Sequence, residues 1–207
     1  MEKTIKPVQV FMAIILLIIG CYSISYLPIK VLKFSSLAVT GFIAYYVLFG
    51  KEGIKNLFSK PTKPIKYVLL FLIANLIYSV VSGIILTLLG LHLKENPLGN
   101  DVNIFFYLPI ALIGEELFSI TIFDLLRTKI SLLPANLISG LIFGLIHFST
   151  YYNGTIVQTL AHILLIQGFA RIIFNSAYVK SKSIYVPWIV HVLFDAISFG
   201  IGIILSH

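Results

Sequence analysis

Two adjacent carboxylates and three histidines lie within the apolar runs of the second half of the chain, and side chains of these types could hydrolyse an amide bond. Glu115 and Glu116 are in the middle of one apolar run, and His147, His162 and His191 are each in a later one. Two neighbouring carboxylates in a low dielectric cannot both be ionised cheaply, so one of them could act as a general base or acid. Imidazoles nearby could orient a water molecule or donate hydrogen bonds to an oxyanion.

The spacing of these residues predicts that they share helix faces. His191 and Asp195 are four residues apart, so they lie on one face of a helix. In an earlier run, Gly140 and Gly144 lie on the same stripe as His147, and two glycines at this spacing let a neighbouring helix approach closely. We therefore expect the polar faces of several helices to converge.

A third run places Gln158 one turn before His162, which again indicates one polar face. His162 has no acidic partner in its own run, so a packing role is the alternative to a functional one. Asp195 has a similar alternative, since it could serve only to orient His191 from one turn away.

Water could be activated either by a carboxylate or by a bound zinc ion. In the second case the ligands would be Glu115, His147 and His191, because glutamate and histidine are competent zinc ligands. The chain lacks both the His-Glu-x-x-His signature of common zinc peptidases and the Gly-x-Ser-x-Gly turn of serine hydrolases. A glutamate mechanism requires no cofactor, and the residues alone leave both mechanisms open.

The composition indicates that a lipid bilayer surrounds these groups. The chain has 207 residues, of which 58% are hydrophobic and 11% charged, and its mean hydropathy is +1.00. A soluble globule has about a quarter of its residues charged. Cys21 is the only cysteine, which excludes an internal disulfide. The basic residues lie in short clusters between apolar runs, so membrane lipids are the expected partners and nucleic acid is not.

The apolar runs predict an all-α, polytopic membrane bundle of about seven transmembrane helices, since one crossing needs roughly 20 apolar residues. We expect about three of them in an N-terminal part, residues 1–103, and about four in a core, residues 104–207, within one integrated membrane domain. The expected spans are Val8–Leu27, Phe34–Gly50, Tyr67–Leu91, Ile104–Leu126, Leu132–Phe148, Ile156–Phe174 and Ile184–Leu205.

The distribution of lysine and arginine predicts an inner N-terminus and an outer C-terminus, because inner loops carry the excess of positive charge. In this orientation eleven of the fifteen basic residues are on the inner side, and Arg171 lies within the sixth span. The outer loops hold only Lys30, Lys33 and Lys94. The basic loop from Lys51 to Lys66 is expected to face lipid headgroups.

Three short motifs in this order resemble the CPBP family of intramembrane proteases, which comprises CAAX-processing and bacteriocin-processing (Abi) enzymes. The motifs are the pair Glu115-Glu116, then Phe143-x-x-x-His147 within LIFGLIH, then His191-x-x-x-Asp195 within SIYVPWIVHVLFD. The resemblance covers about half of the chain, from Ile104 to Ile204.

The resemblance implies a role for each matching position. Glu115 would match the carboxylate that activates water, and His147 would assist it. His191 and Asp195 would match the groups that hold the oxyanion, for which Asp195 must either be protonated or act through His191. The family's first motif has an arginine four residues after the second glutamate, where this chain has Ile120, so Glu116 is expected to lack its counter-charge.

The predicted function is therefore that of a multi-pass intramembrane endopeptidase of a bacterial cell membrane, acting on a membrane-associated peptide or protein. Ile120 motivates an alternative, a non-catalytic protein of the same type that acts in bacteriocin immunity or regulates a membrane partner. A small proton-coupled transporter is less favoured, because the sequence has neither an inverted repeat nor paired broken helices.

Overall fold

The computed structural model describes residues 5–91, 93, 94, 96 and 103–205, and these form helices with no strand among them. The order of elements along the chain is α1 (Pro7–Tyr26), α2 (Lys30–Leu57), α3 (Pro64–Leu88), α4 (Ile104–Arg127), α5 (Leu132–Ile146), α6 (Phe148–Tyr151), α7 (Ile156–His162), the π-helix η2 (Ile163–Gly168), α8 (Phe169–Ser181) and α9 (Tyr185–Leu205).

Six helical segments are long and apolar enough to cross a membrane: α1, α2, α3, α4, α9 and the continuous segment from α7 to α8. The remaining apolar helix, α5, has 15 residues, which at about 1.5 Å per residue covers much of a bilayer core but not all of it. The prediction of an all-helical, multi-pass membrane protein is confirmed.

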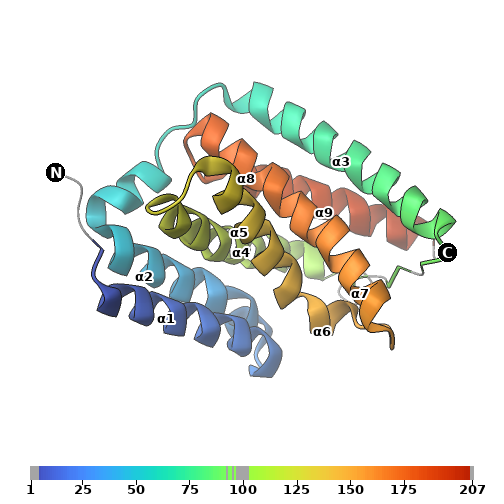
Figure 1. The fold of residues 1–207 in the computed structure, drawn as a ribbon, viewed down its shortest axis with the longest axis horizontal. Coiled ribbons are helices and arrows are strands. Elements are labelled where there is room, and N and C mark those ends of the chain that lie inside the picture. Colours follow the sequence, from blue (N-terminus) through green and yellow to red (C-terminus); the bar gives the residue numbers. More distant parts are fainter. Residues whose placement is uncertain (1–4, 92, 95, 97–102, 206–207) are drawn as a thin grey trace.

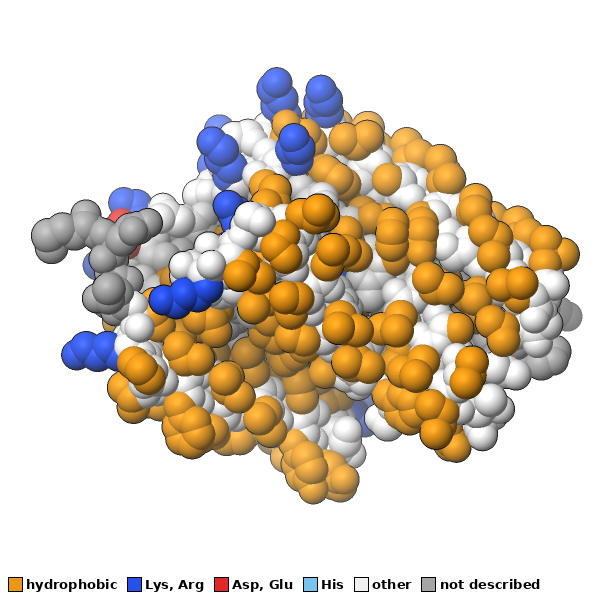
Figure 2. Space-filling model, viewed as in Figure 1, with side chains coloured by type: hydrophobic (Ala, Val, Ile, Leu, Met, Phe, Trp, Pro, Cys, Tyr) orange, Lys and Arg blue, Asp and Glu red, His pale blue; other side chains and the backbone are white. Residues whose placement is uncertain are grey.

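The bundle is arranged around α4, the helix with the two adjacent glutamates. α4 packs against α2 on one side and against α5 and α9 on the other, while α1 contacts α2, and α3 lies against α8 and α9 (Figure 1). α1 and α3 expose long rows of large apolar side chains, as expected where lipid is the solvent. Figure 2 shows hydrophobic side chains spread over much of one face of the molecule.

The predicted close helix approach at Gly140 and Gly144 is confirmed, and the partner is the π-helical segment. A β-carbon added to Gly140 would lie 2.7 Å from the carbonyl oxygen of Gly168, and one added to Gly144 would lie 2.7 Å from that of Ile163. Any larger residue would therefore push η2 away from α5. This contact fixes how the histidine of α7 lies relative to the end of α5.

Candidate active site

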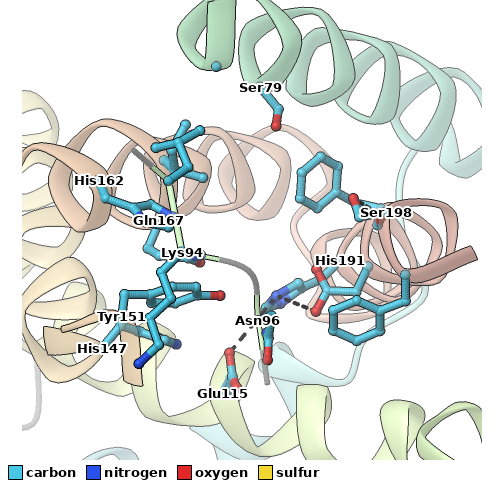
Figure 3. A pocket seen from close by; sticks show the side chains of 16 residues that line it. Ser79, Lys94, Asn96, Glu115, His147, Tyr151, His162, Gln167, His191 and Ser198 are labelled. Atoms are coloured by element: carbon cyan, nitrogen blue, oxygen red, sulfur yellow. Dashed lines mark hydrogen bonds and ion pairs between the residues drawn. The ribbon is translucent and has the colours of Figure 1, made fainter. Parts of the chain in front are cut away.

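A cavity of about 360 Å³ lies where the polar faces of the helices meet, and it collects most of the ionisable residues singled out in the sequence. Glu115 lines it from α4, His191 and Asp195 from α9, His147 from the end of α5 and His162 from the end of α7. In Figure 3 Glu115 and His191 point toward one another, and His147 and His162 lie across from His191. The predicted convergence is confirmed for these five residues.

His191 is the group on which the acids of the site converge. Its Nε2 atom lies 3.9 Å from Oε2 of Glu115 and 3.9 Å from Oδ2 of Asp195. Its Nδ1 atom lies 2.9 Å from Oε1 of Glu116, on the side away from the cavity. One edge of the imidazole therefore faces the two cavity carboxylates, and the opposite edge is held by a third.

Glu116 does not line the cavity but lies behind it, fully buried in an ion pair with Arg171 of α8. Both side chains have 0% exposure, and two parallel hydrogen bonds of 2.8 Å join the guanidinium nitrogens Nη1 and Nη2 to the two carboxylate oxygens. The guanidinium carbon also lies 5.6 Å from the ring centre of Phe143 and 5.2 Å from that of Phe174. A bidentate pair of this kind holds Glu116 as a carboxylate.

The expectation that Glu116 lacks a counter-charge is wrong. Ile120 is fully buried among apolar side chains of α2, α4, α8 and the α8–α9 connection, as its residue type requires. The cation that the resemblance led us to seek on α4 comes instead from α8, 55 residues after Glu116 in the chain. Arg171 was visible in the sequence only as one basic residue within a span, with no motif to link it to the glutamate.

The ion pair also determines the tautomer that His191 adopts. A carboxylate only accepts hydrogen bonds, so the proton between His191 and Glu116 belongs to Nδ1 of the imidazole. The ring is stacked on Phe174 with 4.4 Å between ring centres, which limits its rotation. Arg171, Glu116 and His191 thus form a chain of contacts that ends with Nε2 at the cavity wall.

His147 is held in a similar way by backbone. It follows the last residue of α5, and its Nδ1 atom lies 2.8 Å from the carbonyl oxygen of Phe143. Because a carbonyl only accepts, Nδ1 carries the proton, and Nε2 of the neutral ring is left as a hydrogen-bond acceptor. The two imidazoles therefore offer different hydrogen-bonding groups at Nε2. His191 can donate a hydrogen bond from Nε2 when its ring is doubly protonated, and His147 can accept one at Nε2.

The π-helix brings a residue to the cavity that the sequence did not indicate. His162 and Gln167 both line the cavity although they are five residues apart, a spacing that separates two side chains on an α-helix and brings them closer on a π-helix. Gln158, expected on this face, instead accepts a hydrogen bond of 3.2 Å from Asn153. No sequence signal marks the π-helical segment, so Gln167 could not have been predicted.

Tyr151 and Lys94 also belong to the polar lining, and neither was predicted as a site residue. The Tyr151 ring lies 4.5 Å from that of His162, centre to centre. Burial raises the pKa of Tyr151, which lies outside the membrane-crossing segments, so the phenol remains a neutral donor. His162 contributes one buried atom, Nδ1, with no hydrogen-bond partner among the described residues.

The described residues do not form a metal site. No three histidine, cysteine, aspartate or glutamate side chains in this part of the chain are placed to hold one ion together. Glu115, His147 and His191, the set expected for zinc, share the cavity without meeting at one point.

The fold and the site define a multi-pass membrane protein with a polar, carboxylate-containing cavity inside its helical bundle. Residues 97–197 match the family model described as Type II CAAX prenyl endopeptidase Rce1-like. The matched region contains Glu115, His147, His191 and Asp195, and it confirms the resemblance to CPBP proteases. This region, just under half of the chain, is therefore similar to the CAAX protease family. Neither the curated proteins nor the solved structures include a match.

Proposed function

We propose that this chain is an intramembrane endopeptidase in which Glu115 activates the water that attacks a peptide bond. The observation that carries the proposal is the position of Glu115 at the cavity, 3.9 Å from Nε2 of a histidine whose other nitrogen is held by a buried ion pair. The family match supports a protease-type enzyme. A carboxylate and an oriented imidazole at one water-accessible point are what amide hydrolysis requires.

In the proposed reaction Glu115 is the general base and then the general acid. Its carboxylate accepts a proton from water while the oxygen of that water attacks the carbonyl carbon of the substrate. The tetrahedral intermediate then collapses, the carbon to nitrogen bond breaks, and Glu115 returns the proton to the departing amine. The Glu115 side chain is 25% exposed, so water can reach it. His147 accepts a hydrogen bond at Nε2 and so helps to orient the water.

His191 is proposed to stabilise the oxyanion of the intermediate. When the ring carries two protons, Nδ1 donates to Glu116 and Nε2 is left to donate to the negatively charged oxygen. Asp195, 3.9 Å from the same Nε2, serves either as a second donor when protonated or as an acceptor that keeps the ring in place. Glu116 and Arg171 touch no substrate in this scheme and act by positioning His191.

The observation that motivated the alternative, a non-catalytic membrane protein, does not hold in the structure. It was based on Ile120, which left Glu116 without a cation in the sequence. Arg171 supplies that cation with two hydrogen bonds, so Ile120 no longer argues against a catalytic role.

The experiment is a cleavage assay with purified protein in liposomes and a pool of quenched fluorescent peptides, in which mass spectrometry locates new termini. Glu115→Ala and His191→Ala should each abolish the fluorescence increase and leave membrane insertion intact. Glu52→Ala is the matched control, because Glu52 is an exposed carboxylate on α2 whose side chain is 76% accessible. Equal cleavage by wild type and both site variants would refute the proposal.

A further inference from the structure

The cavity and most of the lysines lie at opposite ends of the bundle. The lining residues of α3 are Ser79 and Gly83, in its second half, and none of the first six residues of α9 takes part. From Glu115, near the middle of α4, the lining continues to the exposed side chains of Leu93 and Lys94 in the α3–α4 connection. The cavity therefore extends from mid-membrane depth toward the end of the bundle where α3 ends and α4 begins.

Two connections meet at this end of the bundle. Nζ of Lys94 donates a hydrogen bond of 3.1 Å to the carbonyl oxygen of Tyr152, which joins the α3–α4 connection to the α6–α7 connection. The first connection follows α3 and the second follows α5 and α6. These helices run through the bundle in the same direction as α1 and α9, so both connections lie at the end of the bundle where α1 ends. The cavity thus lies beneath a face on which, among the described residues, Lys30, Lys33 and Lys94 are the basic side chains.

The opposite end carries most of the positive charge. There the α2–α3 connection is tied to the α8–α9 connection: the backbone nitrogen of Thr62 donates to the carbonyl oxygen of Ser181, and that of Ile184 donates to Leu57, each at 2.9 Å. Around these two connections lie the basic residues Lys51, Lys55, Lys60, Lys63, Lys66, Lys180 and Lys182. Figure 2 shows most of the blue side chains along the left side and the top of the molecule.

An excess of lysine and arginine marks the cytoplasmic ends of membrane helices. We infer that the cavity opens on the extracytoplasmic side of the membrane and receives a polypeptide that reaches it from there. The side on which the cavity opens is independent of catalysis, whereas the identity of the polypeptide as a substrate rests on the proposed function. The chemistry shared by possible substrates is an extended peptide segment at the outer surface, either in an exported peptide or at the outer end of a membrane protein.

Cysteine labelling tests the side of opening without any need for enzymatic activity. The single native thiol is removed by Cys21→Ser, and Ser198→Cys then places one thiol on the cavity wall of α9. Lys60→Cys places the control thiol in the exposed α2–α3 connection. Intact cells are treated with a charged, membrane-impermeant maleimide, and the same cells are treated after permeabilisation.

We expect Ser198→Cys to be labelled in intact cells and Lys60→Cys to be labelled only after permeabilisation. The reverse pattern would overturn the inference, and so would a Ser198→Cys thiol that stays unlabelled in intact cells. Labelling in denaturant measures the total thiol of each variant and shows that both are present. A Glu115→Ala enzyme without activity would leave these patterns unchanged, so failure of the proposed function and failure of this inference are distinguishable.

The source of the polypeptide is tested with vesicles of known orientation and one cleavable sequence. Peptide supplied to the outer face should be cut, and the same peptide enclosed on the lysine-rich side should not. Equal cutting of the free peptide and of a form joined to a transmembrane anchor supports an exported peptide as substrate. Cutting of the anchored form alone supports a membrane protein, and cutting only from the lysine-rich side contradicts the inference.

Discussion

Glu115 and Glu116 are neighbours in the chain but belong to two different environments. Glu115 faces a cavity shared with His147 and Asp195, and its side chain is 25% exposed. Glu116 faces the packed interior, where both of its carboxylate oxygens accept hydrogen bonds from Arg171 and one of them also from His191. Successive residues of an α-helix point about 100° apart, so one short motif delivers a carboxylate to each side of a helix.

The comparison shows that the two carboxylates have different requirements. A general base needs water and freedom to exchange a proton, which the cavity supplies. A positioning group needs a fixed charge and fixed partners, which the ion pair supplies. Substitutions at the two positions should therefore differ in what they damage, activity alone at Glu115 and both stability and activity at Glu116.

The largest combined effect is expected from Glu116→Gln. The change leaves the guanidinium of Arg171 buried without its counter-charge, and breaking a buried pair in this way costs about 3–5 kcal/mol. The thermal midpoint of the protein in detergent should fall, as followed by the fluorescence of the single tryptophan, Trp188. The double variant Glu116→Gln with Arg171→Met removes both charges and should recover much of the stability but little of the activity. A single variant as stable as wild type would contradict the structural role of the pair.

His191→Gln should reduce peptide cleavage by about 10²- to 10³-fold, the range found when an oxyanion donor is removed. The thermal midpoint should change far less than in Glu116→Gln, because the variant leaves the pair between Glu116 and Arg171 in place. His162→Gln is the matched control, since His162 shares the cavity while the hydrogen bond to Glu116 comes from His191. A larger loss of activity in the control than in His191→Gln would require the roles of the two histidines to be exchanged.

The position of the cation can be tested by moving it. Arg171→Leu should lower both activity and the thermal midpoint, and Ile120→Arg in the same chain should restore part of each, because an arginine one turn after Glu116 can reach it. Coupling between residues that share a partner is about 0.5–3 kcal/mol. In the wild-type background, Ile120→Arg should only destabilise, because Glu116 already has its cation. If the losses of thermal midpoint and activity in Arg171→Leu and in Ile120→Arg simply added up in the double variant, the two positions would not share Glu116 as a partner.

The smallest effect is expected from metal removal. Cleavage should be unchanged after treatment with a zinc chelator, since no three potential ligands converge among the described residues. Metal analysis of the purified protein provides the independent measurement. Loss of cleavage on chelation, with recovery on adding zinc, would replace the glutamate mechanism by a metal-bound water.

The sequence predicted the residues that line the cavity better than the network that supports them. Intramembrane histidines and acids are costly in lipid, so Glu115, His147, His191 and Asp195 stand out by type, and helical spacing places each on an inward face. The glycines of α5 likewise predicted a close helix approach. These features depend on local periodicity, which can be read from a single sequence.

Arg171 and Gln167 were beyond this kind of prediction, because each depends on how α7 and α8 are rotated. The π-helical segment between His162 and Phe169 changes that rotation, and neither residue has a neighbour in sequence that reveals its partner. The pair formed by Arg171 and Glu116 joins helices 55 residues apart. Such a contact follows from the packing of the bundle and has no local signature.

The central claim is that, of two adjacent glutamates, Glu115 performs the chemistry and Glu116 holds the site. The most direct measurement is the cleavage rate and thermal midpoint of Glu115→Gln beside Glu116→Gln and wild type in one preparation. The account predicts a rate about 10²- to 10⁴-fold lower for Glu115→Gln, the range for loss of a general base, with a midpoint equal to that of wild type. A Glu115→Gln enzyme that cleaves at the wild-type rate would contradict it.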